Sequence, residues 1–197
     1  MITIQNMHVT LGAHNPMASA FVAALLEGAG EAPSNEEAAA VTIPPIGAIW
    51  PGQGGRNGGL MRGVDGAPNY WQILAEGAEA TAELAWGGYG KDEDIAQSDH
   101  DGLANTKALV ASPYDHPAAE FAAAARVGGF DDWYLPAIRE CRSLSANVPE
   151  LFESSYHWSS TQYSRHYAWM QTFAGGYQDV VVELTTRRVR LVRRLFL

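Results

Sequence analysis

The sequence is poor in cysteine and in positive charge. Its single cysteine, Cys141, excludes an intrachain disulfide and any zinc site built from several cysteines. Because Cys141 shares the apolar side of an expected helix with Ile138 and Leu144, we expect a buried side chain rather than a nucleophile. Lys and Arg number 13 against 22 Asp and Glu, a net charge of -9, which argues against general nucleic-acid binding.

Long hydrophobic runs are also missing. No stretch approaches the ~20 apolar residues of a membrane span, and the N-terminus is neither apolar nor basic enough for a signal peptide. We therefore expect no membrane insertion and no secretion signal, with synthesis and folding in the cytoplasm. A composition of 47% hydrophobic and 18% charged residues predicts one substantial core. The expected division is an N-terminal extension, residues 1–44, and one domain, residues 45–197.

The N-terminal extension has its own pattern. Alternating apolar residues near Met1 predict a short strand, and Asn15 followed by Pro16 predicts the start of a helix that ends near Leu26. The glycine- and proline-containing segment 28–45 is typical of a linker. The apolar helix needs a partner, which leaves two interpretations open: an assembly module, or a segment packed on its own domain.

Three segments contain residues that occur in phosphate-binding, metal-binding or catalytic sites, but none of the three has the pattern that such a site requires. The glycine cluster of residues 51–59 lacks the GK[ST] ending of a phosphate loop and predicts a flexible hairpin loop. The acidic segment 91–102 does not have calcium-loop spacing, so we expect a solvated loop and no metal. Nearby Ser and His residues between His157 and His166 do not form a recognisable catalytic motif, since a triad is defined by geometry. We expect no enzyme and no cofactor.

The last third of the chain alternates with period two, which predicts short strands. Residues 167–173 form one run, Gly175 and Gly176 supply a tight turn, and residues 177–185 form the second strand of a hairpin. A third run after Thr186 predicts a final strand inside a sheet. In the first run one face holds Tyr167, Trp169 and Phe173, and the other holds His166, Met170 and Thr172.

Two helices precede these strands. Residues 117–127 form an alanine-rich amphipathic pattern that begins at a proline and ends at Gly128 and Gly129. A second helix is expected from Pro136 to Asn147, before Pro149. Helices followed by short antiparallel strands predict an α+β fold.

Four motifs near the C-terminus occur in a fixed order: WYLP-x-x-RE from Trp133, WSSTQYS from Trp158, YAW-x-x-x-F from Tyr167 and VR-x-VRR from Val189. Together they resemble the C-type-lectin-like fold of the DUF1566 group, and most closely the variable proteins diversified by diversity-generating retroelements. The tail-fibre receptor-binding protein of a temperate phage has this fold too. The resemblance implies two helices packed on twisted, mainly antiparallel short strands over residues 45–197, and it does not extend to residues 1–44.

The resemblance also implies a solvent-facing binding surface between the WSST motif and the arginine-rich end. Tyr and His offer large contact areas and have few rotatable bonds that lose freedom on binding, and Arg adds directional hydrogen-bond donors. These properties suit a surface that binds a ligand. Core packing of aromatic strand residues is the competing interpretation. The implied displayed set is Tyr163, Arg165, His166, Met170, Thr172, Tyr177, Asp179, Val181 and Glu183. The implied scaffold set is Trp158, Ser159, Ser160, Trp169, Phe173, Val189 and Val192.

By analogy with the resembled proteins, we expect a non-enzymatic recognition protein of a phage virion that binds a bacterial surface protein or polysaccharide. The analogy implies contacts with other virion proteins and a homo-oligomer, with a trimer favoured, so that avidity strengthens weak single contacts. One alternative is a structural virion protein, such as a head decoration or tail-tip subunit. A second alternative is a cellular variable protein diversified by a retroelement.

Overall fold

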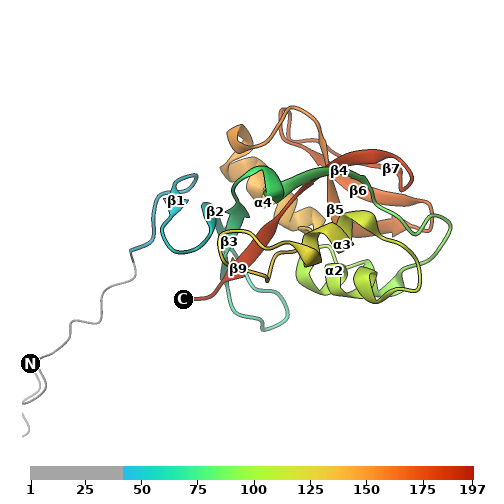
Figure 1. Cartoon of the computed structure of the whole chain (residues 1–197), viewed down its shortest axis with the longest axis horizontal. Helices are drawn as coiled ribbons and strands as arrows, with labels where there is room; N and C mark the ends of the chain where they lie inside the picture. Colours follow the sequence, from blue (N-terminus) through green and yellow to red (C-terminus); the bar gives the residue numbers. More distant parts are fainter. Residues whose placement is uncertain (1–41) are drawn as a thin grey trace, which may run out of the picture. The chain divides into compact units, whose positions relative to one another are not determined.

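The computed structural model describes residues 42–197, and residues 43–197 form one compact unit (Figure 1). The strand and helix expected before Leu26 lie outside the described residues. The expected boundary between residues 44 and 45 stays a prediction. Within the part of the chain that the structure describes, no helix is long and apolar enough to cross a membrane.

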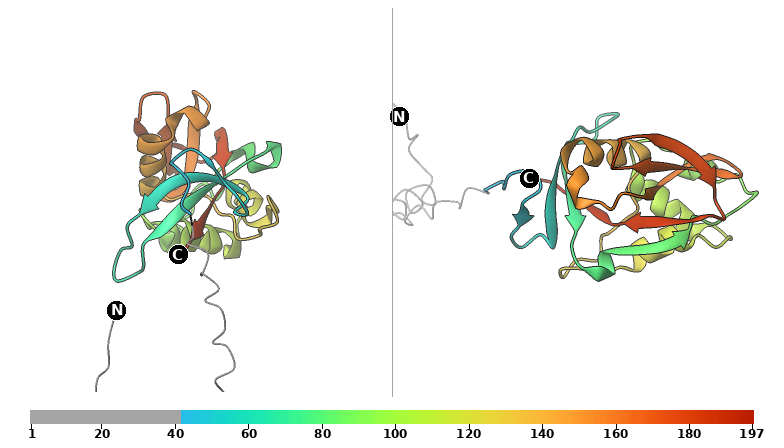
Figure 2. Two further views of the ribbon diagram at one scale, coloured as in Figure 1. Left: turned by 90° about the vertical axis from the view of Figure 1, so that its left-hand side faces the viewer. Right: turned by 90° about the horizontal axis from the view of Figure 1, so that it is seen from above.

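Two sheets form the unit. A four-stranded antiparallel sheet has the order β1-β2-β3-β9, and a five-stranded sheet has the order β4-β8-β5-β6-β7, in which only β5 and β8 pair in parallel. Figures 1 and 2 show the β2–β3 hairpin at one end of the unit and β6 and β7 at the other. The strands are β1 (Ile49–Trp50), β2 (Gly55–Met61), β3 (Tyr70–Ala75), β4 (Thr81–Ala85), β5 (Tyr156–Ser164), β6 (Tyr167–Thr172), β7 (Gln178–Val182), β8 (Thr186–Arg190) and β9 (Val192–Leu195).

Within residues 42–197 three α-helices accompany the sheets, so the predicted α+β class is confirmed. The helix α3 (Pro117–Ala124) and the helix α4 (Ile138–Asn147) match the two predicted helices. The helix α2 (Gly102–Ala111) was not predicted. It begins directly after the acidic segment because the side chain of Asp101 accepts a hydrogen bond from the amide of Ala104, which caps the helix. Three short 3-10 turns are η1 (Ala78–Ala80), η2 (Asp94–Ala96) and η3 (Pro149–Leu151).

The hydrophobic core lies on both sides of the five-stranded sheet. On one side, small residues of α3 and Leu109 of α2 pack against Trp158 and Met170. On the other side, Leu144 of α4 packs with Phe173 in a second cluster. Residues 157–162 of β5 are buried, whereas Tyr163 of β5 and Tyr167 of β6 are exposed and Trp169 is half-buried.

The alternation of β6 is confirmed, but Met170 and Trp169 do not have the exposure that was predicted for them. Met170, expected on the displayed face, is 4% exposed and belongs to the core, while Trp169, expected in the scaffold, is half-buried. Both faces of β6 reach a hydrophobic cluster, because Ala168 and Met170 belong to the main core cluster and Phe173, on the parity of Trp169, belongs to the second cluster. The other six predicted scaffold residues are buried as expected: Trp158, Ser159, Ser160, Phe173, Val189 and Val192.

Two further predictions about local structure need correction. The third run after Thr186 is not one strand, because the chain passes from β8 in one sheet to β9 at the edge of the other, with Leu191 between them. The glycine cluster of residues 51–59 is only partly a loop, since residues 55–61 form β2. A Cβ on Gly58 would lie 2.6 Å from a methyl carbon of Leu144, so glycine there allows α4 to pack on the strand backbone.

Candidate ligand-binding site

A groove of about 390 Å³ lies between the start of α4 and the adjacent residues of β5, β6 and β7. Its aromatic wall consists of Tyr163 from β5 and Trp169 from β6, whose ring centroids are 5.3 Å apart with the rings edge to face. We call this cavity the groove. Its lining residues are Gln97, Asp99, Ile138, Arg139, Arg142, Thr161, Gln162, Tyr163, Trp169 and Gln178.

The other wall of the groove carries two arginines from the first turns of α4. Arg139 and Arg142 are three residues apart, so their side chains lie on the same face of the helix. Nε of Arg139 lies 2.7 Å from a carboxylate oxygen of Asp99, and Arg142 donates to the side-chain oxygen of Gln178. Arg139 is 57% exposed, and exposed ion pairs contribute at most about 1 kcal/mol. These arginines can therefore exchange their present partners for a ligand.

A second group of residues lies at the β5–β6 turn, which follows the groove residue Tyr163 along the chain. Arg165 and His166 form this turn, where a guanidinium nitrogen of Arg165 lies 2.9 Å from the carboxylate of Asp92. The ring of His166 packs on Tyr89, with centroids 4.9 Å apart. Tyr89 and Asp92 belong to the loop that precedes η2. We call these four residues, Tyr89, Asp92, Arg165 and His166, the rim.

The structure brings together only part of the predicted displayed set. Tyr163, Arg165 and His166 lie at the groove and its rim. Thr172 and Tyr177 instead lie at the other end of β6, where they line a separate shallow pocket of about 370 Å³. Asp179 is exposed on the edge strand β7, where its carboxylate accepts the amide hydrogen of Val180.

Three predicted positions are not displayed. Met170 lies in the core, and Val181 is partly buried against the same cluster, because it pairs with the core residue Ala168. Glu183 is fully buried at the end of β7. Its display was therefore predicted wrongly, because residue 183 continues the parity of Val181, which pairs with the buried Ala168 and so faces the core.

Burial raises the pKa of the Glu183 carboxyl to about 7, and the nearby Glu93 and Asp92 carboxylates act in the same direction. A hydrogen bond from Gln162 opposes this rise, with its Nε2 3.0 Å from Oε1 of Glu183. Glu183 is therefore protonated in a large fraction of molecules near neutral pH. It lies beneath the rim rather than at the surface.

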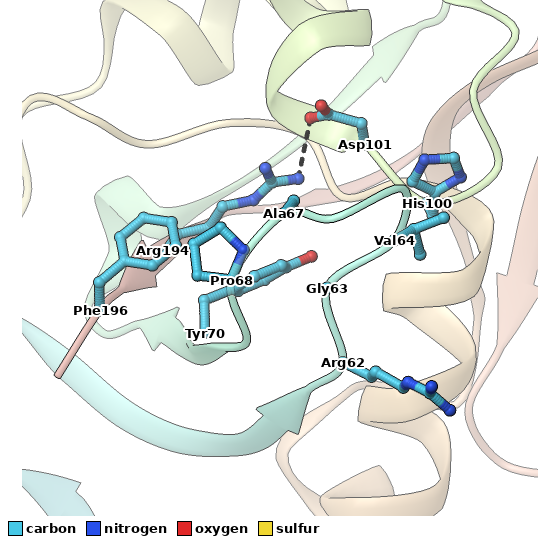
Figure 3. Close-up of a pocket in the computed structure, with 10 residues that line it drawn as sticks. All are labelled: Arg62, Gly63, Val64, Ala67, Pro68, Tyr70, His100, Asp101, Arg194 and Phe196. Carbon is cyan, nitrogen blue, oxygen red and sulfur yellow. Dashed lines mark hydrogen bonds and ion pairs between the residues drawn. The ribbon is translucent and has the colours of Figure 1, made fainter.

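A second pocket, of about 90 Å³, lies between residues 62–70 and the start of α2 (Figure 3). Figure 3 shows the guanidinium of Arg194 pointing toward Asp101, 2.9 Å away, with Tyr70 beside it. Arg194 also lies 3.2 Å from the buried carboxylate of Glu140, which accepts hydrogen bonds from the hydroxyls of Tyr70 and Tyr134. These polar groups already bond to one another, so we assign this pocket a structural role.

Several residues of the groove were missed by the sequence analysis. Trp169 was assigned to the scaffold because the family resemblance implied it, but the structure has it half-buried and lining the groove. Arg139 and Arg142 had a visible signal, their spacing of three residues on the polar side of an amphipathic helix. Gln178 and Asp99 had none, because only the fold places them beside Tyr163.

Comparison with known proteins identifies the family. Residues 70–193, most of the described unit, match the family model of the Lcl C-terminal domain, so the chain belongs to this family. The matched region contains α4, β5 and β6, and therefore both walls of the groove. The match does not extend to retroelement variable proteins or phage tail fibres. No curated protein matches the sequence.

Proposed function

We propose that this member of the Lcl C-terminal domain family is a non-enzymatic recognition protein that binds a ligand on a bacterial surface through the groove and its rim. The observation that carries the proposal is the contact between the exposed Tyr163 and the half-buried Trp169, opposite two arginines. Tyr, Trp and Arg are the residue types that dominate binding energy at protein interfaces.

The aromatic pair supports binding because its geometry exists before a ligand arrives. Tyr163 is 56% exposed, yet its ring is held by Trp169, so little side-chain freedom remains to be lost on binding. The amphipathic rings offer apolar faces together with a hydroxyl and an indole N–H. Such a surface suits the faces of sugar rings and apolar protein side chains alike.

The proposal further assigns this activity to a virion, where several copies would act together; the resemblance of the C-terminal motifs to phage receptor-binding proteins supports this assignment. In that setting the protein is made in the host cytoplasm, contacts other virion proteins and forms a homo-oligomer, with a trimer favoured by analogy. Linking several copies makes the second contact effectively intramolecular, so modest affinity per groove gives strong attachment.

The test compares binding of the protein to intact candidate host cells for the wild type and the Tyr163→Ala, Trp169→Ala double variant. Tyr177→Ala is the matched control, because Tyr177 is 73% exposed but lies at the other end of β6. Urea unfolding first establishes that all three proteins are folded. We expect saturable binding by the wild type and the control, and loss of binding in the double variant.

Two outcomes would contradict the proposal. Binding that is lost in Tyr177→Ala and retained in the double variant would move the site to the pocket beside Thr172. No binding by the folded, oligomeric wild type would favour the structural virion role, in which the same surface contacts neighbouring subunits. Failure of the double variant to enter particles would then be the observation that supports that role.

A further inference from the structure

The carboxyl group of Glu183 lacks the partners that a buried charge needs. The residue is 0% exposed, and its Oε1 accepts one hydrogen bond, from Nε2 of Gln162 at 3.0 Å. Its Oε2 is buried and has no hydrogen-bond partner. None of the ion pairs within residues 42–197 includes Glu183. A buried carboxylate with one hydrogen bond is costly, whereas the neutral acid costs much less.

The side chain of Gln162 connects this carboxyl to residues 89–93, the segment before η2 that carries Tyr89 and Asp92. We call this segment the rim loop. Its Nε2 also donates to the carbonyl oxygen of Lys91, at 2.8 Å, and its Oε1 accepts the amide hydrogen of Glu93, at 2.8 Å. Lys91 and Glu93 flank Asp92, which pairs with Arg165. One amide group thus holds the rim loop and contacts Glu183 at the same time.

The backbone of Glu183 is tied to the same region. Its amide donates to the carbonyl oxygen of His166 at 3.2 Å, and its carbonyl oxygen accepts from the amide of Trp86 at 3.0 Å. The rim loop itself approaches β5 through Gly90, whose amide donates to the carbonyl oxygen of Arg165 at 2.6 Å. Glu183 is therefore the point where β7, the β5–β6 turn and the rim loop meet.

The charged groups around Glu183 do not compensate its negative charge. Glu93 faces it from the rim loop, and Nε2 of His116 lies 3.0 Å from Oε1 of Glu93 rather than near Glu183. Asp92 is paired with Arg165, and the ammonium of Lys91 lies over the ring of Tyr114. Ionisation of Glu183 adds a buried negative charge beside these acidic groups.

We propose that proton binding by Glu183 holds the rim loop against the β5–β6 turn, and that loss of this proton releases the loop and weakens ligand binding at the groove. The effect on ligand binding depends on the proposed function, whereas the loop movement does not. Release would let water reach the carboxylate. It would also separate Tyr89 from His166 and Asp92 from Arg165, and so disassemble the rim.

The direction and size of the effect follow from linkage. The carboxyl binds its proton more tightly in the closed state than in an open, hydrated state, where its pKa returns toward the usual 4.5. Opening therefore becomes more favourable as pH rises through the closed-state pKa of about 7. If the open state hydrates the carboxyl fully, the opening equilibrium should increase by about tenfold between pH 6 and pH 8.

The first experiment measures hydrogen exchange of the amides of Gly90 and Glu93 at pH 6 and pH 8, expressed as protection factors to remove the pH dependence of intrinsic exchange. Amides of α2 serve as the internal reference. The wild type should lose about tenfold protection in the loop at pH 8. Glu183→Gln, which imitates the neutral acid, should keep equal protection at both pH values, and Gln162→Ala should lose protection at both.

Equal loop protection at both pH values in the wild type, or the same loss in Glu183→Gln, would overturn the inference. Glu150→Gln is the control for the substitution, because Glu150 is exposed.

The second experiment measures cell binding by the wild type and Glu183→Gln at pH 6 and pH 8. Binding that weakens at pH 8 only in the wild type supports the full proposal, and binding that is independent of pH despite loop opening refutes its regulatory part. If no cells bind at either pH while the loop still responds, the proposed function fails and the loop device remains supported.

Discussion

The rings of Tyr163 and Trp169 meet edge to face on the five-stranded sheet, with centroids 5.3 Å apart and an interplanar angle of 85°. The contact joins adjacent strands, and aromatic pairs of this geometry contribute about 0.5–1.5 kcal/mol beyond their area burial. The fold therefore presents these rings in a fixed arrangement beside the arginines of α4.

The arginines of the groove should affect binding and not stability. On the proposed function, we expect the Arg139→Ala, Arg142→Ala double variant to lose on the order of tenfold in affinity for the candidate host cells, because both side chains line the groove. Its free energy of unfolding should stay within about 0.5 kcal/mol of wild type, since exposed ion pairs contribute little. Cell-binding titrations and urea unfolding measure the two effects.

Arg126→Ala is the matched control for this double variant, because Arg126 is exposed and hydrogen-bonds only to backbone carbonyls at the end of α3. A large loss of stability in the double variant, or equal loss of binding in the control, would argue against a binding role for Arg139 and Arg142.

Met170 should behave as a core residue. Met170→Ala removes a side chain that packs with Trp158 and Val181, and we expect it to lower the free energy of unfolding by about 2–5 kcal/mol. Equilibrium unfolding in urea measures this change. Thr172→Ala on the same strand is half-buried outside the core clusters and should cost under about 1 kcal/mol. Equal costs for the two variants would mean that the facing of β6 is not as described.

The contrast between Met170 and Trp169 shows how far the sequence could be interpreted. Period-two alternation predicted the β6–β7 hairpin, and helical periodicity predicted α3 and α4. Alternation cannot say which parity faces the core, because both faces of β6 carry large side chains and both sides of the sheet pack against helices. The groove itself was beyond prediction, since it depends on how α4 crosses the sheet and brings Arg142 to Gln178.

Glu140 should be essential for stability although it lies outside the groove. Its buried carboxylate accepts hydrogen bonds from Tyr70, Tyr134 and the amide of Ala137, and it faces Arg194. Burial, together with this carboxylate, raises the pKa of Tyr70, so the hydroxyl stays protonated and donates. Glu140→Gln removes the buried one of the two carboxylates that pair with Arg194, and we expect a loss of about 3 kcal/mol in the free energy of unfolding.

Urea unfolding of Glu140→Gln is compared with that of Glu150→Gln, the same substitution at an exposed position. The control should cost under about 0.5 kcal/mol. If Glu140→Gln left the free energy of unfolding unchanged, the tyrosines and Arg194 would have found other partners. The network would then not stabilise the junction of α2, α4 and β9.

His157 and Glu183 should give the protein opposite responses to acid. Burial beside Phe152 and Phe173 lowers the pKa of His157 to about 4 from 6.5, and Arg188 and Arg190 add to this effect. The unfolded chain then binds a proton that the folded chain does not, so the stability due to neutral His157 is lost as pH falls from 6.5 to 4. The expected loss is roughly 3 kcal/mol.

Glu183 acts in the other direction over nearly the same range. Its folded-state pKa of about 7 lies above the ordinary 4.5, so the folded chain binds the extra proton and its stability rises as pH falls from 7 to 4.5. In the wild type these two contributions largely cancel. Glu183→Gln removes the contribution of Glu183, which stabilises the wild type at low pH. The free energy of unfolding of this variant, relative to wild type, should therefore fall by roughly 3 kcal/mol as pH is lowered from 7 to 4.5.

His157→Leu removes the opposing contribution and should give the reverse trend, with stability relative to wild type rising as pH falls. Urea unfolding of the three proteins at half-unit pH steps from 4.5 to 7 measures both differences. Parallel pH curves for the wild type and Glu183→Gln would mean that the carboxyl titrates as it does in the unfolded chain. The unpaired Oε2 would then be hydrated in solution, and the proton-dependent closure of the rim loop would lose its physical basis.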